Sequence, residues 1–402
     1  MTKTIKKREI YIDKIKPFIN KDIIKVLIWQ RRVWKSYILL QLIEELKLNY
    51  KVSEKDIIYI NMELNEFDNI HDYNDLLKYI KDKSDWKEKT YVFIDEIQDI
   101  TEFEKALRDL QALWIYDIYI SWSNAKLLSS EIATYLTWRY IQFEVYPLNY
   151  KEFLDFHDLT AWKDSFLSYM KVWGLPYLIQ LWTDENITTE YVKSIFNTIL
   201  FKDIVQRYQI RNTSFLENLI KYMADNVWNL TTPNNITKYL KSQKIEIWIN
   251  SVNEYIKYLC SVFLINKVQR QEVIWKKIFE INDKYYFSDI WIRNMLVWGY
   301  KTQDIWKILE NIVFLHFKTL WYQIFVWKNE DKEIDFIVEK NWDKKYVQVA
   351  YLLDKETQKR EFENLLAIPD NYEKIVLTLD EFAGWDWNGI KCYNIINYLT
   401  IW

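Results

Sequence analysis

The sequence predicts an α/β protein that begins with a parallel sheet covered by helices on both faces. In the first 150 residues, apolar strand-like runs alternate with helical patterns, which is the order that builds such a sheet. From about residue 187 to residue 300 the pattern is mainly helical, and the last hundred residues return to alternating strands and helices. We therefore expect three domains, at residues 1–155, 156–300 and 301–402.

Strands of the first domain are expected where runs of β-branched and aromatic residues end in a polar turn. The expected strands are residues 23–28, 56–61, 90–95, 115–121 and 140–146. Between these runs, apolar residues recur at the spacing of an amphipathic helix. The expected helices are residues 35–48, 73–83, 101–113 and 126–136.

The second and third domains have different patterns. Residues 234–243 and 249–271 have the spacing of a helix–turn–helix followed by a strand-like tail, which predicts a winged-helix module. The last hundred residues predict a small α/β domain with helices and strands in mixed order. Its expected elements are helices 303–320 and 356–367 and strands 333–339, 345–351 and 374–379.

Composition excludes several classes of protein. The chain has 54 basic and 57 acidic residues, so no overall basic field draws it to nucleic acid or anionic lipid. Its two cysteines are far apart, which fits a reducing compartment and argues against a disulfide framework. The N-terminus is charged, and no run of 18 apolar residues occurs. We expect a cytoplasmic protein that does not enter the membrane.

The stretch KVLIWQRRVWKSYIL, residues 25–39, has the layout of a phosphate-binding loop that leads from a strand into a helix. The pattern of such loops is G-x-x-x-x-G-K-[ST], and here both glycine positions hold tryptophan. Glycine is needed because backbone N–H groups must approach the phosphates closely. Lys35 would reach the β- and γ-phosphates of ATP, and the Ser36 hydroxyl would bind Mg²⁺. The expected nucleotide-binding residues are Trp29, Gln30, Arg31, Arg32, Val33, Trp34, Lys35 and Ser36.

Tryptophan is abnormally frequent and glycine abnormally rare. The chain has 21 tryptophans and 4 glycines, whereas about 7% of residues in ordinary proteins are glycine. Many tryptophans stand in charged turn segments such as KSDWKEKT and EKNWDKKY, where glycine is typical. A genuinely tryptophan-rich binder of glycans or membrane interfaces would instead carry them on strand faces or in belts. We therefore interpret most tryptophans as UGA codons that the source organism reads as glycine.

Two carboxylates follow the third expected strand, in the segment TYVFIDEIQDI. Asp95 and Glu96 are thus expected at the C-terminal tip of a buried strand, where ligands of open α/β sheets bind. Asp95 would hold Mg²⁺, and Glu96 would orient and deprotonate the attacking water. A strand end with solvated acids is an ordinary feature by itself. About sixty residues after a Lys-Ser loop, it indicates an ATPase site.

Further polar candidates follow the next strand. Asn124 could hydrogen-bond the γ-phosphate or the attacking water, with Ser123 as the fallback, and helix capping by either residue is an equally good interpretation. Arg139 is a candidate contact for the γ-phosphate, in cis or from a neighbouring subunit. A surface arginine before a strand is the alternative. The expected catalytic residues are Glu96, Asn124 and Arg139.

Nearly from end to end, the chain resembles the prokaryotic AAA-type ATPases of the archaeal-ATPase group. The resemblance rests on the segments IKVLIWQRRVWKS, VFIDEIQDI, SWSNAKLLSSEIATYLTWRYIQFEVYPLNYKEFL, VWGLPYL and KEIDFIVEKNWDKKYVQVAYLL. The chain departs from that family mainly where tryptophan replaces glycine. The resemblance implies ATP binding and hydrolysis by Lys35, Ser36, Asp95 and Glu96. It also implies a winged-helix middle region and a restriction-endonuclease-like C-terminal domain of unknown function.

The last domain lacks part of a metal-dependent nuclease site. Such nucleases need an acidic residue and a (D/E)-x-K motif on adjacent strands, where carboxylates bind Mg²⁺ and lysine helps to activate water. Glu310, Glu333 and Asp335 offer carboxylates, but the facing strand reads QVA from Gln348 to Ala350, without carboxylate or lysine. We expect a retained fold used for binding, and no active nuclease.

We therefore expect a Mg²⁺-dependent ATPase that works as a nucleotide-driven switch for its later domains, either alone or as a homo-oligomer. The winged-helix region could bind DNA through Lys238, Lys241 and Lys244, or it could contact a protein. Acids in the same region favour the protein contact slightly. The rival expectation is a non-catalytic DNA- or protein-binding regulator with a degenerate nuclease-like domain, which turns over little ATP.

Overall fold

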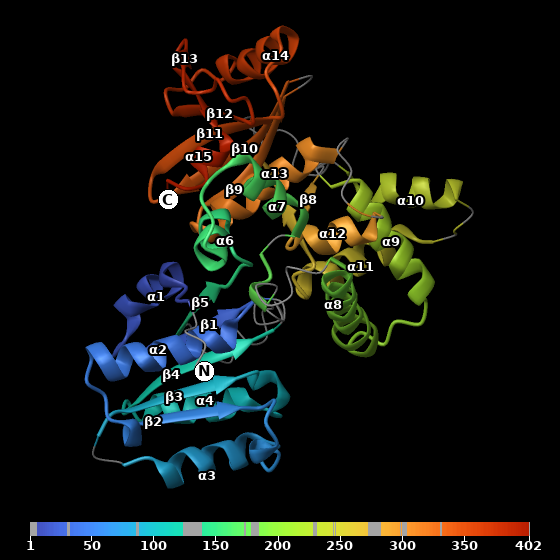
Figure 1. The fold of residues 1–402 in the computed structure, drawn as a ribbon. Helices are drawn as coiled ribbons and strands as arrows, with labels where there is room; N and C mark the ends of the chain where they lie inside the picture. Colours follow the sequence, from blue (N-terminus) through green and yellow to red (C-terminus); the bar gives the residue numbers. More distant parts are fainter. Residues whose placement is uncertain are drawn as a thin grey trace. The chain divides into compact units, whose positions relative to one another are not determined.

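The computed structural model divides into two compact units (Figure 1). The N-terminal unit comprises residues 1–145 and 261–263, and the C-terminal unit comprises residues 146–260 and 264–402. The residues that the structure describes are 6–29, 33–85, 88–123, 139–172, 174–177, 185–227, 231–243, 245, 247–271, 283–297, 299, 304–329 and 332–401.

A five-stranded, all-parallel sheet forms the centre of the N-terminal unit, in the order β2-β3-β4-β1-β5. Its strands are β1 Ile24–Ile28, β2 Ile57–Asn61, β3 Thr90–Asp95, β4 Tyr116–Trp122 and β5 Tyr140–Glu144. Every residue of β1, β3 and β4 is buried, as expected for strands that are covered on both faces. Because β4 lies between β1 and β3, the segments that follow these three strands meet at one edge of the sheet.

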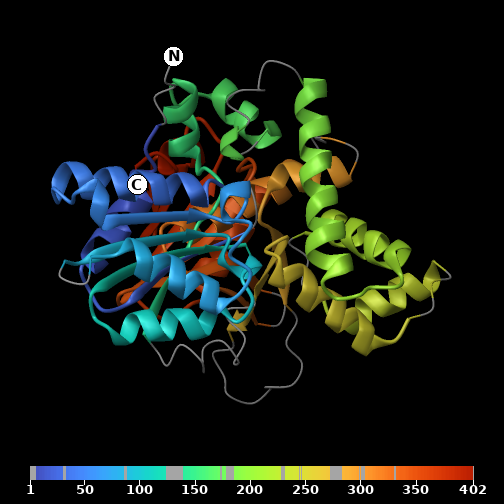
Figure 2. The same cartoon turned by 90° about the horizontal axis from the view of Figure 1, so that it is seen from below.

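Helices cover both faces of this sheet. Figure 2 shows α2 on one face and α3 and α4 on the other. The helices of the N-terminal unit are α1 Glu9–Ile15, α2 Lys35–Asn49, α3 Tyr73–Lys83 and α4 Phe103–Ala112. The predicted α/β fold with a parallel sheet is thereby confirmed, and the expected helix at 126–136 lies outside the described residues.

The first part of the C-terminal unit is helical. Its helices are α6 Tyr150–His157, α7 Lys163–Val172, α8 Glu185–Thr198, α9 Thr213–Asp225, α10 Pro233–Ser242, α11 Ile249–Ser261 and α12 Ile290–Leu296. Helix α8 continues into a π-helical segment, Ile199–Gln206. Strands β6 Ile265–Val268 and β8 Lys284–Phe287 pair antiparallel and form the hairpin sheet of this part. Among the described helices, none is long and apolar enough to cross a membrane.

A seven-stranded mixed sheet forms the second part of the C-terminal unit, in the order β13-β14-β12-β11-β10-β9-β7. Its strands are β7 Arg270–Gln271, β9 Gln323–Asn329, β10 Lys332–Lys340, β11 Asp343–Ala350, β12 Glu373–Thr378, β13 Asp386–Trp387 and β14 Ile390–Asn394. The accompanying helices are α13 Ile305–Thr319, α14 Lys355–Leu366 and α15 Ile395–Tyr398. Strand β7 continues the chain from β6 and pairs parallel with β9, so the hairpin sheet is joined to this sheet by backbone hydrogen bonds.

Among the residues that the structure describes, four tryptophans have left-handed backbone conformations. Their φ angles are 66° at Trp34, 60° at Trp114, 61° at Trp321 and 72° at Trp342. A positive φ is uncommon for any residue except glycine and is a genuine outlier for a bulky side chain. Glycine reaches this region without steric cost. At these four positions the backbone conformation therefore favours glycine over the tryptophan of the sequence.

Two of these positions belong to well-defined turn types. Trp321 follows α13, where its N–H donates to the Lys318 carbonyl (2.9 Å) and the Tyr322 N–H donates to the Phe317 carbonyl (3.0 Å). This is a Schellman motif, whose left-handed residue is usually glycine. Trp342 is the second residue of the two-residue β10–β11 turn, after Asn341 with φ 47°. Positive φ at both residues makes a type I′ turn, for which Asn-Gly is strongly preferred.

Candidate nucleotide-binding site

The loop after β1 places Lys35 at the centre of the site. Lys35 begins α2 and is buried, and its Nζ donates to the Trp29 carbonyl oxygen at 3.1 Å. The same Nζ lies 3.9 Å from Glu96 Oε1. A buried ammonium that points back across its own loop is placed to contact an anion bound there. Val33, just before the helix, is fully buried.

Asp95 ends β3 and faces the start of α2. Its Oδ1 accepts a hydrogen bond from the Ser121 hydroxyl of β4, while its buried Oδ2 has no hydrogen-bond partner among the described residues. Burial raises the pKa of Asp95, and the Ser121 hydroxyl, the nearby Ser36 hydroxyl and the charge of Lys35 act in the opposite direction. A cation at this carboxylate would offset the cost of its burial. Ser36 therefore lies near Asp95, and the magnesium site that the sequence predicts at these two residues stays a prediction.

Glu96 has a strained backbone, with φ 55° and ψ 50°. Its N–H donates to Ser121 Oγ at 2.9 Å, and Gln98 Nε2 donates both to its carboxylate and to Ser123 Oγ, the latter at 3.3 Å. A non-glycine residue in this region costs about 1–3 kcal/mol and persists only where the surrounding structure enforces it, most often at functional sites. The carboxylate is thus held beside Lys35 at the edge of the sheet.

Arg8 and Gln98 also contact the site residues and were not predicted from the sequence. Arg8 is fully buried, its guanidinium donates to the Val33 carbonyl at 3.1 Å, and its own N–H donates to Gln41 Oε1 at 3.1 Å. Arg8 therefore links the N-terminal segment to the loop before α2 and to α2 itself. Arg8 lies in the basic run KTIKKREI, where no motif or periodic pattern marks it as a site residue. Gln98 lies in IDEIQDI, two residues after Glu96, and this proximity to the carboxylates could have identified it.

Arg139 is not brought to this site. It precedes β5, whose first residue Tyr140 pairs with Ile24 at the start of β1, and its guanidinium lies over the Trp114 ring at 5.9 Å. The nucleotide loop follows Ile28, at the other end of β1. The expected contact in cis is therefore wrong, because parallel strands place the segment before β5 at the opposite edge of the sheet. The contact from a neighbouring subunit stays a prediction.

Several expected residues lie outside the described part of the chain: Gln30, Arg31, Arg32, Asn124 and Lys244.

The two loop tryptophans pack against other aromatic rings. Trp29 stacks on Phe263 with ring centroids 4.4 Å apart, and Trp34 lies 4.7 Å from the Tyr37 ring. Trp34 itself is the left-handed residue directly before Lys35, the place of the second glycine of the loop pattern.

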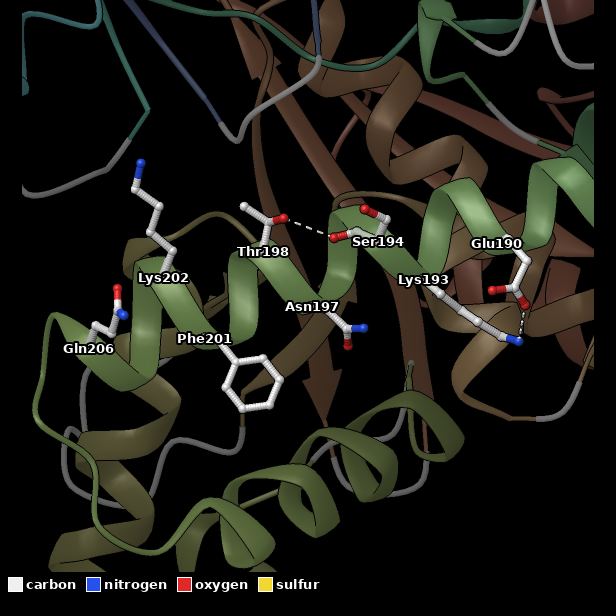
Figure 3. A pocket seen from close by; sticks show the side chains of 8 residues that line it. All are labelled: Glu190, Lys193, Ser194, Asn197, Thr198, Phe201, Lys202 and Gln206. Atoms are coloured by element: carbon white, nitrogen blue, oxygen red, sulfur yellow. Dashed lines mark hydrogen bonds and ion pairs between the residues drawn. The ribbon is translucent and has the colours of Figure 1, made fainter. Parts of the chain in front are cut away.

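A surface hollow of about 630 Å³ lies elsewhere, on one continuous helical face of the C-terminal unit (Figure 3). Its wide opening and its lining by a single helical segment make it a weaker candidate than the loop. Glu190 and Lys193 pair with each other at 2.6 Å along this face. The lining residues are Glu190, Lys193, Ser194, Asn197, Thr198, Phe201, Lys202 and Gln206.

Comparisons with known proteins agree with this geometry. Residues 21–154 match the family described as an AAA domain, and residues 163–303 match a domain of unknown function (DUF8612). An uncharacterized protein of Haemophilus influenzae is 33% identical over an alignment of 404 positions, which covers 99% of this chain and 100% of that protein. The chain belongs to the family of this protein.

A second member of the family, an uncharacterized protein of Methanocaldococcus jannaschii, is 31% identical over 85% of this chain and 80% of its own length. Among solved structures, a Walker-type ATPase of Pyrococcus abyssi superposes with a TM-score of 0.50 at 16% identity. The match covers 72% of this chain and 95% of that chain. At this identity the likeness shows the fold alone, and the N-terminal domain of this chain has the fold of P-loop ATPases.

Proposed function

We propose that the protein binds ATP with Mg²⁺ at the edge of its five-stranded sheet and hydrolyses it. One observation carries the proposal: the buried Lys35 ammonium lies between its own loop and the Glu96 carboxylate, 3.9 Å away. Lys35 would contact the β- and γ-phosphates, and Glu96 would hold the attacking water and accept its proton. The AAA domain match over residues 21–154 supports the same conclusion.

The residues present fit a magnesium ion. Asp95 offers a buried carboxylate oxygen that has no hydrogen-bond partner among the described residues, and the Ser36 hydroxyl stands beside it. Hard oxygen ligands of this kind suit Mg²⁺, which usually also keeps waters and phosphate oxygens in its shell. Bound there, the ion would neutralise charge that develops on the phosphates.

Single-turnover hydrolysis tests the assignment of Glu96. In a chain carrying Trp29→Gly and Trp34→Gly, Glu96→Gln should reduce phosphate release by roughly 10²–10⁴-fold while ATP still binds. Glu102→Gln is a matched control, because Glu102 has the same left-handed φ of 55° but is exposed. Equal phosphate release by the Glu96→Gln protein and its parent would favour the rival, a non-catalytic regulator.

We further propose that positions 29 and 34 are glycine in the native protein, as UGA codons read as glycine would produce. The left-handed φ of 66° at Trp34, at a glycine position of the loop pattern, supports this proposal. Peptide mass spectrometry of the protein from its source should find glycine at both positions, and tryptophan there would contradict the proposal. In calorimetry, the chain with tryptophan at positions 29 and 34 should bind ATP more weakly than the Trp29→Gly, Trp34→Gly chain.

The later modules would respond to the nucleotide. Three helices, α9 to α11, are followed by the β6–β8 hairpin, and an isolated bridge joins Thr231 to Asp283. This order supports a winged-helix module, and the helix α13 with strands β9 to β12 supports a restriction-endonuclease-like sheet. Lys238 and Lys241 are exposed on α10. A protein contact remains our preferred role for this module, and salt-dependent binding of duplex DNA that Lys238→Ala weakens would favour DNA instead.

A further inference from the structure

A buried lysine of the hairpin ends inside a group of carboxylates in the C-terminal unit. Lys284 of β8 is 1% exposed. Its Nζ lies 2.9 Å from Glu310 Oε1, 2.8 Å from Glu333 Oε1 and 3.6 Å from Asp335 Oδ1. Glu310 belongs to α13, and the other two acids belong to β10. The ammonium group therefore stands at the point on which these three carboxylates converge, and these are the acids that resemble a nuclease metal site.

Other protein donors also contact two of these three carboxylates. Asp335 Oδ2 accepts from the Val349 N–H at 2.9 Å, and Glu310 Oε1 accepts from the Tyr286 hydroxyl at 2.5 Å. Gln348 stands where a nuclease would have a metal-binding carboxylate. Its amide nitrogen donates to Glu361 Oε2 at 2.5 Å, and its amide oxygen accepts from the Asp335 N–H at 3.3 Å. The neutral amide of Gln348 thus connects Glu361 to the backbone of Asp335.

The electrostatics keep the lysine charged. Burial lowers the pKa of Lys284, but the charges of Glu310, Asp335 and Glu333 outweigh this effect and raise the pKa above its ordinary value. Burial also raises the pKa of Asp335, an effect that Glu310 strengthens and Lys284 opposes. Within the described ranges, no group of three or more acids, histidines or cysteines is arranged to hold a metal ion. The space that a metal would need is filled by the ammonium group.

We propose that Lys284 is the resident cation of this site, taking the place that a divalent metal would occupy, and that it ties the hairpin sheet to the C-terminal sheet. The inference is independent of ATP hydrolysis. A second connection runs beside it, because β7 pairs with β9 and the Val326 N–H donates to the Gln269 carbonyl at 3.1 Å. The C-terminal sheet then has no metal-dependent nuclease chemistry and serves as a rigid support for the hairpin.

Metal-dependent thermal unfolding of the full chain tests this proposal. Lys284→Met keeps the length of the side chain and removes its charge, leaving buried acids unneutralised, so the unfolding midpoint should fall by roughly 5–10 °C. Millimolar Mn²⁺ should restore part of that loss in Lys284→Met and leave the wild type unchanged. Lys267→Met is the matched control, because Lys267 on the neighbouring strand β6 forms a half-exposed ion pair with Asp283 at 2.7 Å.

A second variant keeps the test decisive if Lys284→Met does not fold. Lys284→Met combined with Glu310→Gln removes one charge of each sign, and it should fold and melt above the single variant. Three results would each overturn the proposal. These are a Lys284→Met protein that melts with the wild type, one that Mn²⁺ does not stabilise, and a wild-type Mn²⁺ site in calorimetry that Asp335→Asn abolishes.

Discussion

Replacing Trp342 with glycine should stabilise the C-terminal unit. Trp342 is fully exposed at the tip of the β10–β11 turn, so its indole contributes no packing that the substitution would remove. Its φ of 72° is a left-handed conformation, which costs a non-glycine residue roughly 1–2 kcal/mol. Glycine removes this cost but gives the unfolded chain more freedom, which offsets about 0.4–1 kcal/mol. The net gain should be about 1 kcal/mol.

Chemical denaturation followed by circular dichroism measures this gain, and the unfolding midpoint on heating should rise by roughly 2–4 °C for a unit of this size. Trp248→Gly is the control. Trp248 is 85% exposed, precedes α11 as the carbonyl acceptor for Val252, and is not among the residues with positive φ. Its replacement should leave stability within about 0.5 kcal/mol. If Trp342→Gly were no more stable than Trp248→Gly, backbone strain would not be the reason to expect glycine at position 342.

Three further changes test other parts of the structure. Arg8→Met removes a charged hydrogen bond to the Val33 carbonyl and should raise the Kd for ATP about tenfold in calorimetry, whereas an unchanged Kd would show that the loop does not need this support. Gly174→Ala would place a Cβ 2.3 Å from the Leu148 carbonyl oxygen, and urea denaturation should show a loss of about 2–3 kcal/mol; full stability would contradict the packing. Burial lowers the pKa of His316 to about 3, below its ordinary value of about 6.5. The contribution of neutral His316 to the free energy of unfolding is therefore fully present above pH 6.5 and is lost as the pH falls toward 3. Between pH 7 and pH 5 the wild type should lose about 2 kcal/mol that His316→Leu keeps, and parallel pH profiles would refute this.

Short apolar runs that alternate with helical patterns were sufficient to predict the parallel sheet. Strands 90–95 and 115–121 were expected within one residue of β3 and β4, because strands buried on both faces are continuous apolar runs. Strand β9, Gln323–Asn329, was not expected, since its polar ends and the two tryptophans near it gave no alternation. The order β2-β3-β4-β1-β5 depends on tertiary pairing, which no local pattern encodes.

The site was predictable where its residues are neighbours in the sequence. Lys35 with Ser36 and Asp95 with Glu96 each form a short motif at the end of a strand, and the structure brings both pairs together. Arg8 could not be predicted, because its contact with Val33 spans 25 residues and depends on how the N-terminal segment packs. For Arg139, the sequence supplied a residue type, but the direction of β5 relative to β1 decides the edge on which it lies.

Each of the two units contains a buried lysine close to carboxylates, but we propose different roles for the two groups. In the N-terminal unit, Lys35 is buried with its Nζ 3.9 Å from Glu96 Oε1, and Asp95 keeps a buried oxygen without a hydrogen-bond partner in the described part of the chain. In the C-terminal unit, Lys284 contacts Glu310 at 2.9 Å and Glu333 at 2.8 Å, and Asp335 Oδ2 accepts from the Val349 N–H at 2.9 Å. A carboxylate that is to bind a cation must keep an oxygen available at a cost in stability, whereas a buried acid in a structural cluster is stabilised by the donors that contact it. This difference favours the sheet edge of the N-terminal unit over the Lys284 cluster as the place of the proposed ATP hydrolysis.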